Sequence, residues 1–168
     1  MGRAGGEQVE GERGVVVAES ERVAGAGARS LEEGGNAFDA VAAAGLACAM
    51  VHPDKCGVGG YLLAAVAVEG ATGRVWSVDA NSRAPAAAHE EMYDVGPAVA
   101  GEGLNAREYD CTVRGDANVY GPLAVGVPGQ MAGIGTLHER SGRLAWSTVV
   151  QPALDLLADG IPLSPGLT

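Results

Sequence analysis

Residues 34–60 read GGNAFDAVAAAGLACAMVHPDKCGVGG, and the rest of the chain can be placed around this stretch. Asn36 is a favourable N-cap residue, and Asp39 lies three positions later, where a carboxylate meets free backbone amides and the positive end of the helix dipole. Every residue from 41 to 51 is apolar or glycine, so the helix has no face suited to water, and Pro53 stops it. We therefore expect a buried central helix of about 15 residues, ~22 Å long, which is too short to cross a bilayer.

The composition is that of a single globular unit with a tightly fitted core. The chain has 168 residues, 47% of them hydrophobic, but only 4% are aromatic and 27 are glycine. At this length roughly 70% of the unfolded surface can be buried. The net charge is -10 and basic residues do not cluster, so nucleic acid is not an expected partner. Three cysteines without a CxxC spacing indicate neither a disulfide framework nor a zinc site.

The N-terminus is interpreted as a flexible lead-in over residues 1–13, because it is polar and rich in glycine. The first apolar run, residues 15–18, has only four residues, which is too few for the core of a secretory signal. We therefore expect no export signal, no membrane partner and, by default, a cytoplasmic location.

Working outward on the N-terminal side, residues 14–18 predict a short strand because three β-branched residues follow a glycine. Ser20 can cap a helix that ends at Gly34. Gly25 and Gly27 lie inside that helix, where each costs about 1 kcal/mol, so we expect the central helix to pack closely against it.

On the C-terminal side, residues 61–68 and 74–79 predict a hairpin whose first strand is buried on both faces. A long irregular stretch is expected over residues 86–119, and loops of this length are usually functional or mobile. A strand is predicted within residues 121–129. Two helices then follow, at 130–140 and 147–158, with Ser147 as the cap of the second and Gly160 at its end.

Several stretches of the sequence contain residue types that could carry chemistry. Residues 57–60, Gly-Val-Gly-Gly, follow a helix and open a strand, which is the reverse of a dinucleotide-binding motif. His52, Asp54 and Cys56 alternate, but a loop that contains Pro53 seldom directs all three at one metal ion. Cys56 is a candidate nucleophile only if a base lies beside it, and a structural role is favoured. No metal or cofactor is expected.

Several motifs in the chain resemble, in the same order, the N-terminal part of the gamma-glutamyltransferase family, also called the gamma-glutamyltranspeptidase family. The resemblance covers about residues 14–168. The motifs are GGNAFDA at 34–40, CGVGG at 56–60, APAAA at 84–88 with Met92-Tyr93, VPG at 127–129 with Gly133, GRLAW at 142–146, Pro152-Ala153 and DGIPLS at 159–164.

The resemblance implies an α+β fold that is part of the αββα fold of N-terminal-nucleophile hydrolases. In this family the precursor cleaves itself, and the freed N-terminal threonine of the C-terminal segment attacks gamma-glutamyl amides such as glutathione. The acyl group then passes to water or to an amino acid. Residues 14–168 are accordingly interpreted as the N-terminal part of a large subunit, without a catalytic residue of its own. The expected partners are a gamma-glutamyl small molecule and the C-terminal catalytic segment.

The resemblance also implies one substrate-binding position within the chain. In related sequences an arginine two residues after the aspartate of the motif that ends in Ala-Pro binds the α-carboxylate of the substrate. Counted from Asp79, that position is Asn81, and Arg83 lies two residues further on. Either Arg83 takes over the role, or gamma-glutamyl recognition is weakened and the chain is acylase-like. The alternative from another class is a non-catalytic binding or assembly module derived from the fold.

Overall fold

The central helix forms as the sequence predicts, in a computed structural model that describes residues 9–12, 14–60, 62–96 and 112–162. Helix α2 spans Ala37–Val51. The side chain of Asn36 accepts hydrogen bonds from the backbone N–H groups of Phe38 and Asp39, at 2.8 and 3.3 Å. The Asp39 carboxylate in turn accepts from the Asn36 N–H at 2.8 Å, which completes a capping box.

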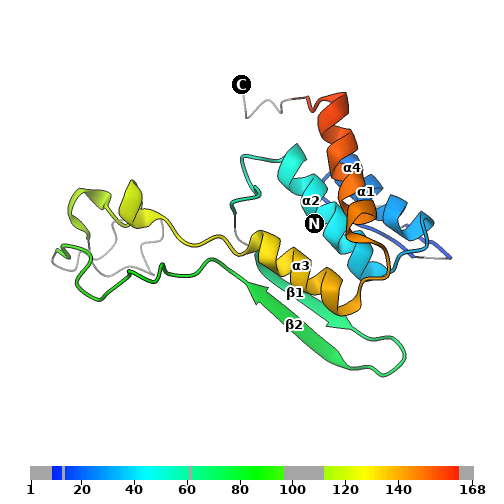
Figure 1. Ribbon diagram of the computed structural model, residues 1–168, viewed down its shortest axis with the longest axis horizontal. Helices are drawn as coiled ribbons and strands as arrows, with labels where there is room; N and C mark the ends of the chain where they lie inside the picture. Colours follow the sequence, from blue (N-terminus) through cyan, green and yellow to red (C-terminus); the bar gives the residue numbers. More distant parts are fainter. Residues whose placement is uncertain (1–8, 13, 61, 97–111, 163–168) are drawn as a thin grey trace, which may run out of the picture. The chain divides into compact units, whose positions relative to one another are not determined.

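Three further helices pack against α2 (Figure 1): α1 (Glu21–Glu32), α3 (Gln130–Ser141) and α4 (Trp146–Asp159). Small residues permit this close packing, since a side chain on Gly45 would begin 3.2 Å from Ile134 Cδ1. Small and branched residues of α2, α3 and α4 form the buried core: Ala42, Ala43, Leu46, Ile134, Val149 and Ala153.

Helix α2 is not covered on every side, contrary to the prediction that it is buried all round. Val41, in the first half of the helix, is 53% exposed. The segment 14–18, predicted as a strand, has no strand structure, and Val17 in it is 87% exposed. A strand needs a hydrogen-bonded neighbour, and none of the described residues pairs with this segment.

Helix α1 begins and ends where the sequence predicts. The Ser20 side chain accepts from the Val23 N–H at 3.4 Å, and Gly34 follows the helix with a φ of 91°. Gly27 meets α2 closely, since a side chain there would begin 3.0 Å from the Ala40 carbonyl oxygen. Gly25 has no neighbour within 4 Å, so the predicted close packing is confirmed only at Gly27.

The predicted hairpin is present, with β1 (Leu62–Val68) antiparallel to β2 (Val75–Ala80). Helix α3 lies along β2 (Figure 1). On this side Trp76 stacks on Phe38, with ring centroids 5.3 Å apart, and the Arg140 guanidinium lies 4.2 Å from the Trp76 ring. The prediction that β1 is buried on both faces is wrong, because Val66 and Val68 are 69% and 66% exposed.

Residues 82–128 form a second compact unit, apart from residues 1–81 and 129–168. Its described part contains two single-turn 3₁₀ helices, Arg114–Asp116 and Pro122–Ala124, and two isolated β-bridges, Arg83 to Val127 and Val95 to Val113. The strand predicted within 121–129 is therefore replaced by a 3₁₀ turn and a single bridge. The irregular stretch predicted from 86 to 119 is seen in its described residues, 86–96 and 112–119.

The start of α4 also differs from the prediction. Ala145, not Ser147, is the N-cap residue, and no side chain caps the helix. The end agrees, since Gly160 follows α4 with a φ of 79°. No helix within the described ranges has the length and apolar character that a membrane span requires.

Candidate functional site

The last residues of β2 carry the first predicted binding position. The Asn81 N–H donates to Asp79 Oδ1 at 3.0 Å, so the Asp79 side chain fixes the backbone turn at the end of the hairpin. Asn81 itself is exposed. This turn therefore fixes the backbone at Asn81.

The end of the hairpin meets the start of α3 at Gly129. A side chain on Gly129 would collide with the carbonyl oxygen of Ala80 and would begin 2.7 Å from that of Asn81. Only glycine permits this approach, which explains the glycine in the Val-Pro-Gly motif. The contact fixes the position of the first residue of α3 relative to Asn81.

The loop of residues 56–60, which we call the glycine loop, contacts the same end of α3. The Gln130 N–H donates to the Gly60 carbonyl at 3.3 Å, and a side chain on Gly60 would begin 3.0 Å from Gln130 Oε1. Gln130 is 5% exposed, and its Oε1 has no hydrogen-bond partner among the described residues. Two segments far apart in sequence, the hairpin end and the glycine loop, are thus gathered at the N-terminus of α3.

Arg83, the second predicted binding residue, lies at the start of the other unit. Its backbone exchanges two hydrogen bonds with Val127, at 3.1 and 2.8 Å. The residue is exposed, and within the described part of the chain its guanidinium has neither a hydrogen-bond nor an ion-pair partner. The backbone at Arg83 is therefore fixed, while its charged group is available to an added carboxylate.

Cys56, the candidate nucleophile, lies in an environment that does not activate its thiol. Its sulfur is 3.2 Å from Cys48 Sγ and 3.5 Å from the His52 carbonyl oxygen. Burial, followed by the hydrogen bond with Cys48, raises the pKa of Cys56 to about 12. The reactive thiolate is therefore scarce near neutral pH, and the geometry favours the structural role. His52, Asp54 and Cys56 form no metal-binding group within the described residues.

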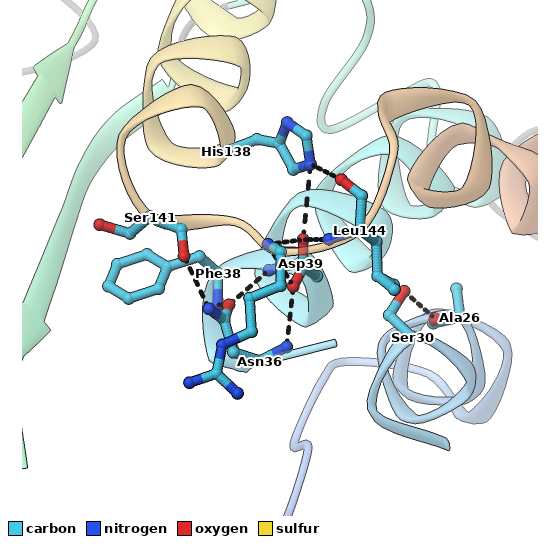
Figure 2. Close-up of polar contacts among 9 residues, drawn as sticks. Ala26, Ser30, Asn36, Phe38, Asp39, His138, Ser141 and Leu144 are labelled. Carbon is cyan, nitrogen blue, oxygen red and sulfur yellow. Dashed lines mark hydrogen bonds and ion pairs between the residues drawn. The ribbon is translucent and has the colours of Figure 1, made fainter. Parts of the chain in front are cut away.

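A polar network around Asp39 is the feature that sequence reasoning did not find (Figure 2). Asp39 is fully buried, and its carboxylate accepts from the backbone N–H groups of Arg143 and Leu144 at 3.1 and 3.2 Å. His138 Nε2 donates to the Leu144 carbonyl at 2.9 Å and lies 3.4 Å from Asp39 Oδ1. The network fixes the connection between α3 and α4 against the start of α2. Its local half, the capping box, was visible in the sequence, whereas the contacts across about a hundred residues carried no sequence signal.

The exposed side of α2 forms one wall of an open groove. The groove has a volume of about 720 Å³ and lies between α1, α2 and the extended segment that precedes α1. Mostly apolar residues line it, among them Val15, Val16, Val17, Leu31, Val41, Ala44 and Cys48.

Comparison with known proteins gives one consistent family. The gamma-glutamyltranspeptidase family model matches residues 23–168. Glutathione hydrolase 2 of Arabidopsis thaliana is 32% identical over 151 residues, which cover 90% of this chain and 23% of that protein. The acylase ACY 1 proenzyme of Pseudomonas sp. (strain SE83) is 34% identical over 158 residues, which cover 94% of this chain and 27% of that protein. The chain therefore spans only about a quarter of the length of these relatives.

The fold is similar to that of solved members of the same group. The crystal structure of Helicobacter pylori gamma-glutamyltranspeptidase matches with a TM-score of 0.73 and 29% identity, over 89% of this chain and 39% of that chain. The predicted fold class, an α+β fold that is part of an N-terminal-nucleophile hydrolase, is confirmed by this likeness.

Proposed function

This chain belongs to the gamma-glutamyltranspeptidase family, and on that premise we propose that it forms the N-terminal part of the large subunit of a glutathione hydrolase. The reaction is acyl transfer from a gamma-glutamyl amide to water or to an amino acid. The observation that carries the proposal is the family match over residues 23–168. It is supported by the similarity to a glutathione hydrolase, whose alignment covers 90% of this chain.

In this function the chain binds and positions the substrate, while a threonine in the C-terminal catalytic segment attacks the amide. A gamma-glutamyl group carries an α-carboxylate, which requires a cationic or hydrogen-bonding partner. Arg83 supplies a guanidinium that has no partner within the described residues, on a backbone fixed by its two bonds with Val127. Asn81 is the alternative partner, with its turn fixed by Asp79. An arginine can form two parallel hydrogen bonds with a carboxylate, so Arg83 is the preferred residue.

The same proposal gives the apolar groove a partner. A catalytic segment that completes the fold would cover the exposed valines beside α2 and would supply the neighbour that the extended segment 14–18 lacks. We therefore propose this segment as the macromolecular partner of the chain.

An acylase-like function is the second candidate. The departure at Asn81 from the family arginine favours it, as does the 34% identity to an acylase proenzyme. An acylase of this kind would accept N-acyl amides that carry no α-carboxylate, and it would not need a cation near the end of the hairpin.

The two functions are separated by substrate preference in the protein completed by its catalytic segment. A glutathione hydrolase should release aniline from a gamma-glutamyl anilide much faster than from the butyryl anilide, which keeps the acyl chain as far as the α-carbon but lacks the α-amino and α-carboxylate groups. Equal or faster turnover of the butyryl anilide would favour the acylase. If the protein has cleaved its own precursor and still turns over neither anilide, the non-catalytic module is favoured.

A further inference from the structure

Two cysteine side chains outside the proposed substrate site face one another. Cys48 lies in the last turn of α2, and Cys56 lies on the loop that follows the helix. Their sulfur atoms are 3.2 Å apart, and both residues are half-buried and carry free thiols. Contact between two thiols from different structural segments requires that the loop fold back onto the helix.

The loop is held in that position by its own backbone. The N–H groups of Lys55 and Cys56 donate to the His52 carbonyl at 3.0 and 2.9 Å, which forms a tight turn directly after α2. A disulfide requires a sulfur separation of about 2.05 Å, so the two atoms must approach by roughly 1 Å. Gly57 and Gly59 have no atom within 4 Å of the point where a side chain would begin. Close packing therefore does not hold these two positions of the loop.

Both cysteines line hollows that open to solvent. Cys48 lines the apolar groove of about 720 Å³, and Cys56 lines a separate hollow of about 360 Å³ formed by the loop itself. Of the charged groups near the pair, Glu19 from the segment before α1 is ion-paired with Lys55, and Asp54 lies on the loop. The high pKa of Cys56, caused by burial, means that Cys48 is the thiol expected to react first.

We propose that Cys48 and Cys56 are a site of reversible disulfide formation, by exchange with a low-molecular-weight disulfide. The Cys48 thiolate attacks one sulfur of that disulfide, forms a mixed disulfide and releases one small thiolate. Cys56 then loses its proton to solvent and attacks Cys48 Sγ, which forms the protein disulfide and releases the second small thiolate. The two cysteines are oxidised and the small disulfide is reduced to two thiols, so electrons balance.

The bond links the end of α2 covalently to the loop that leads into β1. Gly60, at the end of this loop, accepts the hydrogen bond from Gln130 at the start of α3. Oxidation therefore restrains the glycine loop next to the place where the end of the hairpin contacts the start of α3. Neither Asn81 nor Arg83 takes part in the bond. The inference does not depend on the proposed function, since it rests only on the two thiols and their surroundings.

The test is equilibration of the reduced 168-residue chain with mixtures of reduced and oxidised glutathione at pH 8, then acid quenching, alkylation and peptide mass mapping. We expect the mass of the chain to fall by two hydrogen atoms, with residues 48 and 56 joined and only Cys111 alkylated. The native chain should reach half-oxidation at a glutathione ratio at least about tenfold more reducing than the same chain in urea, because folding holds the two thiols together.

Three variants serve as controls. Cys111→Ser should form the same disulfide at the same ratio, because Cys111 takes no part. Cys48→Ser and Cys56→Ser should accept glutathione as a mixed disulfide but lose no pair of hydrogens. The proposal is overturned if Cys48 and Cys56 both remain alkylated under conditions that oxidise the urea-unfolded chain, if either is joined to Cys111, or if native and unfolded chains oxidise at the same ratio.

Discussion

Removal of the Asp39 carboxylate should be among the most damaging single changes in this chain. Three backbone N–H groups, those of Asn36, Arg143 and Leu144, donate to it, and Asp39 is fully buried. A buried N–H group left without a partner reduces the free energy of unfolding by about 1–3 kcal/mol. Arg143 is exposed, so its N–H can form a hydrogen bond with water instead. The other two donors, of which the Asn36 N–H is the one in the capping box, together predict that Asp39→Ala reduces the free energy of unfolding by about 2–6 kcal/mol.

The matched control is another aspartate, on α4, that is not buried. Asp155 pairs with Arg29 at 2.6 Å, but its side chain is 44% exposed and the pair is screened by water, so Asp155→Ala should change the free energy of unfolding little. Urea unfolding of both variants, followed by far-UV circular dichroism and by the fluorescence of Trp76 and Trp146, measures the difference. Equal losses in the two variants, or a loss below about 1 kcal/mol for Asp39→Ala, would refute the assignment of Asp39 as the polar centre of the helix packing.

Three other outcomes are expected. Gly129→Ala should destabilise the chain by about 1–3 kcal/mol in the same urea assay, because the new side chain meets the Ala80 and Asn81 carbonyls; the control Gly135→Ala, inside α3 with no neighbour within 4 Å, should be neutral or stabilising by up to ~1 kcal/mol. Residues 1–168 alone should bind a hydrophobic dye or self-associate through the open groove, and Val17→Glu should reduce both; a monomer without dye binding would speak against an uncovered interface. Residues 1–168 alone should also fail to hydrolyse a gamma-glutamyl anilide, since the family places the threonine nucleophile in the C-terminal catalytic segment. The expectation is contradicted if the chain hydrolyses the anilide faster than the rate without protein and Cys56→Ala abolishes this activity.

Local signals in the sequence predicted the helical part of the fold. The capping box at Asn36, the cap at Ser20 and the glycines at 34 and 160 act within a few residues of the element they define. Both ends of α1, the start of α2 and the end of α4 follow from them. The hairpin was also predictable, because the short turn that joins its two strands is a local signal, close in sequence to both of them.

Features that depend on distant partners were not predictable. Residues 14–18 have high β propensity, but a strand exists only where another segment pairs with it, and the described residues offer none. The bonds from Asp39 to the backbone at 143 and 144 cross more than a hundred residues. The motif fixed the positions of Asn81 and Arg83 along the chain, whereas the bonds of Asn81 to Asp79 and of Arg83 to Val127 became apparent only in three dimensions.

The affinity of the completed protein for a gamma-glutamyl substrate, measured with Arg83→Ala, tests the central claim most directly. Loss of a charge-assisted pair with the α-carboxylate costs about 1.5–3 kcal/mol, so KM for a gamma-glutamyl anilide should rise roughly ten- to a hundredfold. Arg114→Ala is the control, because this exposed arginine of the same unit already pairs with Asp94 at 2.7 Å and should leave KM unchanged. An unchanged KM in Arg83→Ala, together with a raised KM in Asn81→Ala, would contradict the account and assign the carboxylate to Asn81.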